Sequence, residues 1–447
     1  MQLKYKLIAI GVLIVVLTAA LAMINGLVSE RQSLQYDVQQ EIARSSSGEQ
    51  QIIGPFLVAK FKKDVLETST DGKTQRLVTH YVYKNLLPKK FEFNGNLDTQ
   101  YRALGIYKAL LYQAKNNIRG EFVIPHNWVE MEDATLMNVV MVTAISDVRG
   151  IQNGLALTLN DRSFELLPST GNKRFKNGVH SDIEPQWLAQ QQQLKFKLTL
   201  NLQGMESLNI APIGQETAVN ITASWPHPSF IGNYLPIEST IEENSFTAHW
   251  QTTFFATNMA KKMSHCINSA ACDDIHHSVL GVSLVDPVNQ YLKTDRAIKY
   301  AELFILLILF GFMAFEIFKG YSVHPVQYTL VGVSMALFYL LLLSLSEHIA
   351  FNTAYVIASV SCAAVLGIYI SGVLGEIKHG LLFSVGVLVL YAILFGLLAA
   401  EDFALLMGSI FVFVLVGTVM IVTRRVDWYQ LGKSKANDES TEIAQRD

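Results

Sequence analysis

The sequence predicts a membrane protein with six transmembrane α-helices, one N-terminal and five C-terminal. A large extracytoplasmic β-rich, sandwich-like domain is expected between helices one and two. Half of the 447 residues are hydrophobic and only 16% are charged, whereas a soluble protein has roughly 25% charged residues. Apolar runs of the length that crosses a bilayer, about 20 residues, occur near the N-terminus and in the last third. The region between them alternates with period two, as half-buried strands do.

The first apolar run covers residues 7–28 and contains no charge. Ala20-Leu21-Ala22 resembles a signal-peptidase site, so cleavage is an alternative, but apolar residues continue to Val28 and favour an uncleaved anchor. Helical spacing of the apolar residues up to Ile42 predicts that this helix continues as a stalk. The other five runs are residues 300–318, 328–346, 354–375, 380–400 and 403–423.

The distribution of basic residues predicts the orientation in the membrane. The short loops on one side carry Glu347, His348, Glu401 and Asp402 but no Lys or Arg, whereas the ends on the other side, including both termini, are basic. The positive-inside rule therefore places both termini in the cytoplasm. The basic residues at the other ends are Lys4, Lys6, Lys319, Lys378, Arg424, Arg425, Lys433 and Lys435. The predicted organisation is a cytoplasmic stub and anchor (1–28), a periplasmic β-rich domain with a helical stalk (29–299), a five-helix bundle (300–423) and a cytoplasmic tail (424–447).

The outer domain is expected to consist of two packed antiparallel sheets. The clearest strand is residues 195–202, where Lys, Thr and Asn alternate with Phe and Leu. Residues 101–116 have an ambiguous pattern. Residues 187–193 could form one or two helical turns. Further strands are predicted at residues 78–83, 90–93, 155–159, 219–224, 246–250 and 279–285.

Short motifs in order along nearly the whole chain resemble those of the CreD family of bacterial inner-membrane, cell-envelope integrity proteins. The longest are Ser224-Trp225-Pro226-His227-Pro228-Ser229-Phe230 and His324-Pro325-Val326-Gln327-Tyr328. Others are Glu30-Arg31, Gly54-Pro55, Asp147 with Arg149-Gly150-Ile151, His249-Trp250-Gln251, Asp286-Pro287, Thr294-Asp295-Arg296-Ala297, Ser346-Glu347-His348 and Asp427-Trp428-Tyr429. The resemblance implies an inner-membrane protein of Gram-negative bacteria linked to a two-component regulon and to envelope stress. It implies no known reaction.

Cys266 and Cys272 depart from that family's pattern. In an oxidising compartment a disulfide between them is expected. Unpaired surface thiols are an alternative, and so is a metal site with the neighbouring histidines, although the spacing suits a tetrahedral zinc site poorly. Cys362 lies within an apolar run and is expected to pack as a small apolar side chain.

The string around Trp225, His227 and Phe230 is a candidate partner-contact loop. Prolines on both sides hold His227 on a stiff, extended segment, and histidine titrates near neutral pH. The alternative is a rigid corner in which the imidazole bonds to a backbone carbonyl.

Two candidate features concern the helices. Small residues recur every four positions in the third C-terminal run and predict close helix contact, within the bundle or along a dimer seam or substrate path. They are Ser359, Ala363, Gly367, Ser371 and Gly375. Separately, at least one of the bases Arg296 and Lys299, which follow Asp295 and share a helix face, is expected to pair with Glu347, Glu401 or Asp402 and so dock the outer domain on the bundle. The alternative is that all five charges are solvated at the headgroup level.

The composition excludes several functions. A net charge of −3 argues against nucleic-acid binding, and three cysteines exclude a disulfide-framework fold or a multi-cysteine metal fold. The chain has no Gly-x-Ser-x-Gly, Walker or His-Glu-x-x-His motif. The prediction is therefore a non-enzymatic protein without a cofactor or metal, whose periplasmic domain contacts an envelope protein or cell-wall component. A transporter or lipid-handling protein that uses the bundle is the main alternative, and a periplasmic hydrolase is a third.

Overall fold

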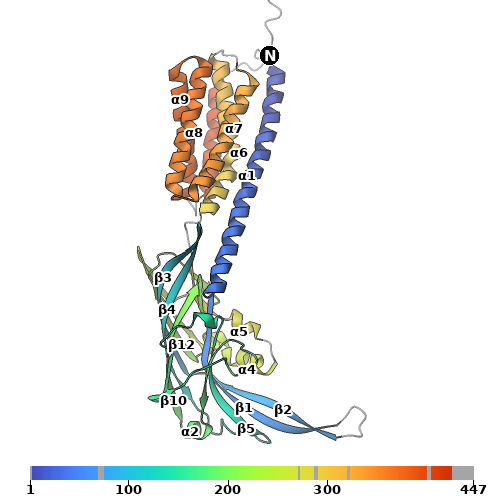
Figure 1. Cartoon of the computed structure of the whole chain (residues 1–447), viewed down its shortest axis with the longest axis vertical. Helices are drawn as coiled ribbons and strands as arrows, with labels where there is room; N and C mark the ends of the chain where they lie inside the picture. The colour runs from blue at the N-terminus through green and yellow to red at the C-terminus, as the bar shows by residue number, and fades with distance from the viewer. Residues whose placement is uncertain are drawn as a thin grey trace, which may run out of the picture. The chain divides into compact units, whose positions relative to one another are not determined.

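The computed structural model describes residues 3–68, 75–269, 272–285, 290–319, 323–399 and 404–424. The chain forms two compact units (Figure 1). The membrane unit comprises Met1–Leu34 and Val288–Asp447, and the β unit comprises Gln35–Pro287. The first boundary lies after residue 34 rather than residue 28, because α1 continues past its apolar run. The second lies before residue 288 rather than after residue 299, because α6 begins ten residues before its apolar run.

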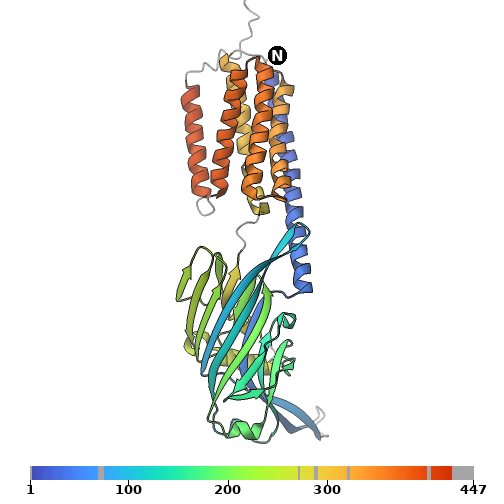
Figure 2. The same cartoon turned by 60° about the vertical axis from the view of Figure 1, so that its left-hand side comes forward.

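The membrane unit is a helical bundle. α1 is one continuous helix, and its Leu17 packs at Gly332 of α7, where any larger residue would clash with the leucine. α7 begins with Pro325 and is capped by His324, whose Nδ1 accepts from Val326 N–H. Figure 2 shows the helices side by side. Their bounds are α1 (Leu3–Ser45), α6 (Gln290–Lys319), α7 (Pro325–Ser346), α8 (Phe351–Leu374), α9 (Ile377–Ala399) and α10 (Ala404–Thr423).

Four helices within the described residues are long and apolar enough to cross a membrane, rather than the predicted six. They are α1, α7, α8 and α9. α6 carries five charged residues in its first half, Lys293, Asp295, Arg296, Lys299 and Glu302, and charge in a span is costly. Among the described residues, α10 contributes a shorter apolar helix, Leu406–Thr418. The class, a membrane protein, is confirmed by these helices.

The β unit contains two sheets, each of eight strands in the described residues. The first has the order β13-β16-β11-β1-β5-β9-β8, with β2 paired to β1 alone, and the second has the order β14-β15-β12-β3-β4-β10-β6-β7. The first sheet consists of β1 (Gln50–Thr68), β2 (Gln75–Leu86), β5 (Thr135–Ile145), β8 (Leu167–Pro168), β9 (Gly178–Ile183), β11 (Ser207–Ile210), β13 (Pro228–Gly232) and β16 (Leu280–Leu284). The second consists of β3 (Lys90–Leu104), β4 (Tyr107–Val123), β6 (Ala156–Leu159), β7 (Arg162–Phe164), β10 (Gln193–Met205), β12 (Glu216–Ala223), β14 (Glu238–Ile241) and β15 (Phe246–Thr253).

The prediction of antiparallel sheets is wrong for one pair in each sheet. β1 and β11 run parallel, and so do β3 and β12. Both pairs join strands that are more than 100 residues apart in sequence, and such long connections allow either direction. All the other strand pairs recorded in the described residues are antiparallel.

One buried core contains side chains from both sheets. Alternate residues of β10, such as Phe196 and Leu198, are buried, and so are Ile52 and Phe56 of β1. Residues 101–116 are strand, because β3 and β4 form a hairpin in which Leu104 pairs with Tyr107. The shorter helices are α2 (Pro185–Ala189), α3 (Phe254–Thr257), α4 (Met259–Ser269) and α5 (Asp273–His277), with a 3-10 turn, η1 (Val148–Gly150).

Candidate functional site

The predicted partner-contact loop contains one exposed residue, His227, and two half-buried ones, Trp225 and Phe230. Trp225 Nε1 donates to Val285 O at 3.0 Å, and the Trp225 ring lies edge-on to Tyr101 with centroids 5.9 Å apart. His227 is exposed, whereas Phe230 packs edge-on to Phe246 and Trp250 with centroids at 6.1 and 5.7 Å. Only His227 is therefore exposed, Trp225 and Phe230 are both half-buried against the core, and the partner-contact role stays a prediction.

This loop lies at the end of the β unit where the chain enters and leaves. Val285 is five residues before Gln290, the first residue of α6. The foot of α1, through Ile42 and Ala43, packs on Ala109, Leu111 and Met205 of β4 and β10. Tyr101 pairs with Leu110 of β4, so the loop and the foot of α1 share one stretch of the β3–β4 hairpin.

Asp147 anchors the foot of α1. Its Oδ2 accepts from Gly48 N–H at 3.0 Å and from Arg149 Nη2 at 2.6 Å, and Arg149 Nη1 donates to Arg44 O at the end of the helix. The Arg149 guanidinium and the backbone donors hold the pKa of Asp147 below its usual range. Gly150 completes this corner, because a Cβ there would lie 2.2 Å from Gln203 O. Asp147, Arg149 and Gly150 form one of the motifs that carry the family resemblance, and in the structure they hold the end of α1 in place.

Two carboxylates lie close together in the same region. Burial, and the nearby carboxylate of Glu49, raise the pKa of Glu206. Glu49 Oε2 accepts from Ser207 Oγ at 3.0 Å. Glu206 also holds the two sheets in register, since its N–H donates to Leu110 O and its C=O accepts from Leu284 N–H. Sequence inspection missed this pair because the two residues are far apart in the chain.

One end of the membrane unit contains a buried ion pair. Lys6 Nζ contacts Glu316 Oε1 and donates to Val323 O at 2.9 Å. The Glu316 carboxylate also accepts from Tyr328 OH at 2.6 Å and from Val323 N–H at 3.2 Å. The side chains of Lys6 and Glu316 are only 11% and 12% exposed. The sequence shows that Lys6 and Glu316 lie at the ends of apolar runs, but it does not show that they are partners.

Glu347 has a basic partner on α1, Arg31. Arg31 Nε lies 3.5 Å from Glu347 Oε1, and Tyr291 OH donates to the same atom at 3.3 Å. Lys299 instead pairs with Asp295 at 2.6 Å, four residues before it on α6. The Lys299–Asp295 contact has the i, i+4 spacing that favours an ion pair within one helix. The docking of Arg296 or Lys299 on Glu347, Glu401 or Asp402 stays a prediction. Glu401 and Asp402 lie outside the described residues.

The small-residue stripe lies where α8 meets α9. Ser384 Oγ of α9 donates to Ala363 O at 2.8 Å, and a Cβ on Gly367 would lie 2.9 Å from Ser384 Cβ. On the other helix, a Cβ on Gly380 would lie 2.3 Å from Gly367 O. Ser359 and Ser371 bond within α8, to Tyr355 O and Gly367 O, and Gly375 ends the helix with a left-handed backbone. The stripe serves close helix packing within the bundle.

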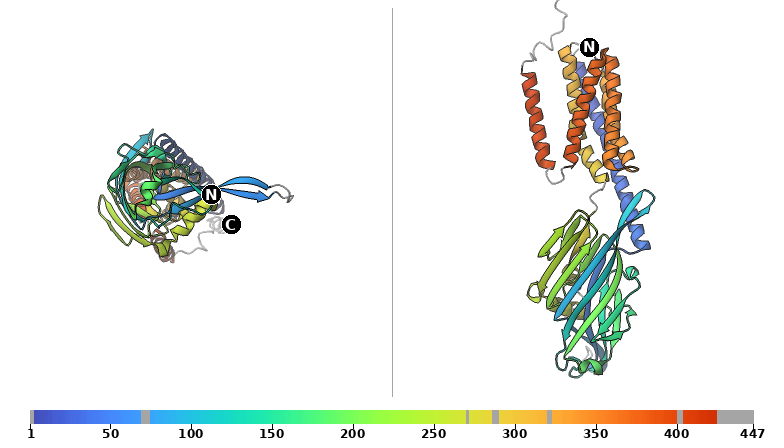
Figure 3. Two further views of the ribbon diagram at one scale, coloured as in Figure 1. Left: turned by 90° about the horizontal axis from the view of Figure 1, so that it is seen from below. Right: turned by 90° about the vertical axis from the view of Figure 1, so that its left-hand side faces the viewer.

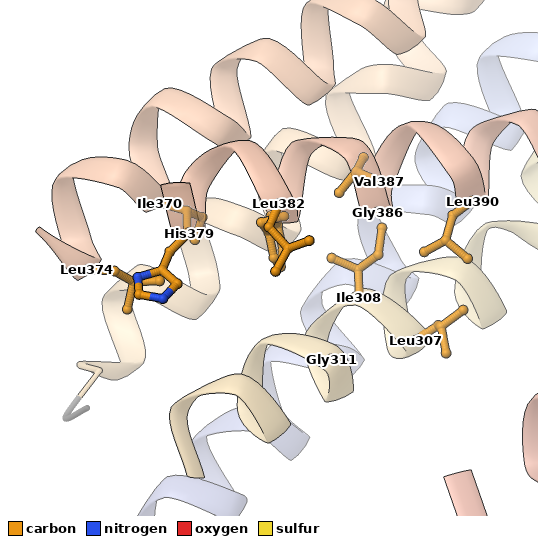
Figure 4. A pocket seen from close by; sticks show the side chains of 11 residues that line it. Leu307, Ile308, Gly311, Ile370, Leu374, His379, Leu382, Gly386, Val387 and Leu390 are labelled. Atoms are coloured by element: carbon orange, nitrogen blue, oxygen red, sulfur yellow. The ribbon is translucent and has the colours of Figure 1, made fainter. Parts of the chain in front are cut away.

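An apolar cavity of about 470 Å³ lies between α6, α8 and α9 (Figure 4). Its wall is almost wholly aliphatic, with Ile308 and Gly311 from α6, Ile370 from α8 and Gly386 from α9. His379 is the one titratable side chain in the wall, and its Nδ1 lies 3.2 Å from Glu376 Oε2. A cavity of this kind suits a hydrocarbon chain rather than a polar substrate.

The cysteines occupy two environments. Cys266, at the end of α4, and Cys272, before α5, form a disulfide with Cα atoms 4.4 Å apart. Cys362 is a free, buried thiol that accepts from Tyr391 OH at 3.4 Å. Among the residues that the structure describes, no three or more His, Cys, Asp or Glu side chains are grouped to hold a metal ion.

The helices and the β unit define a multi-helix membrane protein with one large β-rich domain inserted after its first helix. The family model described as "Inner membrane protein CreD" matches residues 2–429. The chain is also 33% identical to Inner membrane protein CreD of Escherichia coli (strain K12) over 441 residues, covering 98% of this chain and 96% of that one. The chain therefore belongs to the CreD family of inner membrane proteins.

Proposed function

We propose that this protein contributes to envelope integrity through non-catalytic contacts of the β unit in the periplasm. The termini are cytoplasmic in this proposal, and α6 and α10 cross the bilayer together with α1, α7, α8 and α9. The asymmetry of Lys and Arg between the two sets of loops supports the orientation. The charged start of α6 fits a span whose first turns lie in the headgroup region, where charges remain hydrated.

One ribbon of the β unit carries the proposal. β1 pairs with β5 only as far as Lys62, but β1 and β2 continue to pair alone to Thr68 and Gln75. Figure 3 shows this ribbon projecting from the rest of the β unit. Leu66 and Leu77 are register partners on one face and are 62% and 68% exposed. Exposed apolar surface on a strand pair is typical of a protein-binding site, to which a partner adds side chains or a strand.

The partner we propose is another envelope protein that docks on Leu66 and Leu77. In a strain that lacks the protein, Leu66→Glu with Leu77→Glu should fail to restore tolerance of envelope stress. It should also abolish a crosslink from a photoreactive residue at Thr79, which is exposed on the same face. The matched control is Ile241→Glu, which changes another exposed apolar residue of the β unit. Full restoration of tolerance by the double variant would overturn the proposal, and a crosslink to peptidoglycan alone would replace the protein partner by the cell wall.

The six-span orientation is tested with periplasm-active reporters. Activity is expected after Ser47 and Asp402, and none after Lys319, Glu376 or Asp447. If α6 did not cross, a reporter after Lys319 would be active, and if α10 did not cross, the reporters after Asp402 and Asp447 would agree.

The aliphatic cavity favours a second candidate function, the handling of a lipid chain by the bundle. A Cβ on Gly386, in the cavity wall, would meet nothing within 4 Å, so Gly386→Leu fills the cavity without a clash at that atom. Gly396→Leu, equally unhindered and outside the wall, is the control. Native mass spectrometry should show a bound lipid in the control that Gly386→Leu lacks, and equal lipid in both would exclude the cavity as its site.

A further inference from the structure

The turn of the β3–β4 hairpin carries apolar side chains that the β unit does not cover. β3 and β4 pair from Lys90 to Leu104, and Gly105 and Ile106 form the turn. Gly105 has a φ of +63°, which glycine adopts without strain. The exposed fractions are 49% for Tyr101, 44% for Leu104 and 41% for Ile106. The same hairpin is buried on alternate residues nearer its base, so the exposure is confined to the end.

The hairpin end also has one sign of charge. Residues 99–120 contain Arg102, Lys108, Lys115 and Arg119 and no Asp or Glu. Arg102 and Lys108 are exposed and flank the turn. Apolar and aromatic side chains between basic residues are the composition of segments that enter the interface of an anionic bilayer.

The hairpin and α1 run in the same direction. Ser47, just after α1, donates to Gln203 O, and Gln203 is the register partner of Gln113 in β4. Ile42, earlier in α1, packs on Ala109 and Leu111, nearer the turn. Following α1 toward its N-terminus therefore follows β4 toward Ile106. The hairpin beside the foot of α1 is visible in Figure 1 and Figure 2.

The lengths of the two elements agree with a membrane contact. α1 is one unbroken helix, and its uncharged apolar run ends at Val28. The ten residues from Val28 to Val38, which packs on the same cluster, cover about 15 Å at 1.5 Å per residue. The three residues from Ala109 to Ile106 cover about 10 Å of that distance at 3.4 Å per residue. The remaining distance of about 5 Å is of the order of the length of the Leu104 and Ile106 side chains.

We propose that the β3–β4 turn is a membrane-binding element that inserts Leu104 and Ile106 into the interface of the bilayer while Arg102 and Lys108 bind anionic phospholipid headgroups. The occupant of this surface is lipid rather than protein. What favours lipid is that the end of α1, the helix with the N-terminal apolar run, packs on this hairpin.

The test uses the full-length protein in nanodiscs. An environment-sensitive fluorophore is attached at Ile106→Cys in a Cys362→Ala background, without reductant so that Cys266 and Cys272 stay paired. Lipids that carry a quencher near the headgroup should quench this probe several-fold more than the same probe at Leu77→Cys, the exposed control on the distant ribbon. Labelled proteins are compared only where their unfolding temperatures equal that of the unlabelled protein.

Charge provides the second measurement. Quenching at Ile106 should increase when anionic lipid replaces zwitterionic lipid, and Arg102→Gln with Lys108→Gln or added salt should remove the increase. A blue-shifted probe that lipid-attached quenchers do not reach would mean that the turn packs on protein, and it would overturn the proposal. Equal quenching at Ile106 and Leu77 would overturn it as well.

Discussion

Arg31 and Glu347 meet across the membrane unit, with Nε 3.5 Å from Oε1. Arg31 lies on α1, whereas Glu347 is the residue that ends α7, more than 300 residues later. Tyr291 of α6 donates to the same carboxylate. Three helices from opposite ends of the chain are thus joined at one carboxylate, and the side chain of Glu347 is only 12% exposed.

The first prediction is that Arg31 and Glu347 are energetically coupled. Arg31→Ala should lower the free energy of unfolding of the purified protein by no more than about 1 kcal/mol, because the arginine is 44% exposed. Glu347→Gln should cost more, since it also weakens the bond from Tyr291. The double variant should lose less than the sum of the two single changes.

A matched control for this cycle uses Lys299→Ala, which removes a cation of the same membrane unit that pairs with Asp295 instead. Its combination with Glu347→Gln should be additive. If Lys299 and Glu347 were coupled as strongly as Arg31 and Glu347, Lys299 would be a partner of Glu347 as well.

The second prediction concerns Lys6 and Glu316. Lys6→Met should destabilise the bundle by about 3 kcal/mol, because it leaves a carboxylate that is almost fully buried without its counter-charge. Adding Glu316→Gln removes the charge and should recover much of the loss, while the amide oxygen still accepts from Tyr328 OH. Unfolding in mixed detergent micelles measures both, and Tyr5→Ala, an exposed neighbour, is the control. If Lys6→Met were as mild as Tyr5→Ala, the ion pair would have no structural role.

Much of the fold could be predicted because its signals are local. The alternation of β10 and the apolar length of α7, α8 and α9 are both visible in short windows of sequence. The parallel pairs of β1 with β11 and β3 with β12 could not be predicted, since they depend on which distant segments meet. α4 was missed because it is short; its buried Met259, Met263 and Ile267 have helical spacing, but the helix is only 11 residues long.

The candidate site was less predictable than the fold. His227 is exposed, whereas Trp225 and Phe230 are both half-buried, because Trp225 packs on Tyr101 and Phe230 on Phe246 and Trp250. The partners of Glu316 and Glu347 come from α1, and nothing in the local sequence around either acid indicates that helix. Burial of Glu206 beside Glu49 likewise depends on the packing of two distant segments.

The third prediction is a pH dependence at Glu206. Its pKa is raised in the folded protein by burial and by Glu49, so the folded state binds this proton more tightly than the unfolded state does. Below the ordinary pKa of glutamate, near pH 4, both states are protonated and no penalty exists. As the pH rises through the folded pKa, the ionised carboxylate becomes destabilising.

Glu206→Gln should therefore raise the unfolding temperature at about pH 8 and leave it nearly unchanged near pH 4. Glu92→Gln, which removes an exposed carboxylate of β3, controls for the change in net charge. A gain for Glu206→Gln that is equal at both pH values would contradict the assignment.

The fourth prediction is that Cys266 and Cys272 are joined in the protein purified from the membrane. Mass spectrometry of a non-reduced digest should find the two peptides linked, and reduction should separate them. Because the closed loop is small, the disulfide should stabilise the β unit by about 2 kcal/mol. Cys266→Ser should still fold, since Met263 and Ile267 keep α4 on the core.

Adding Cys272→Ser to Cys266→Ser should cost little more stability, and reductant should lower the stability of the wild type by the same amount as Cys266→Ser does. The control is Cys362→Ala, which removes the free thiol and leaves the bond intact. Free alkylation of both Cys266 and Cys272 in the native protein would show that the bond is absent.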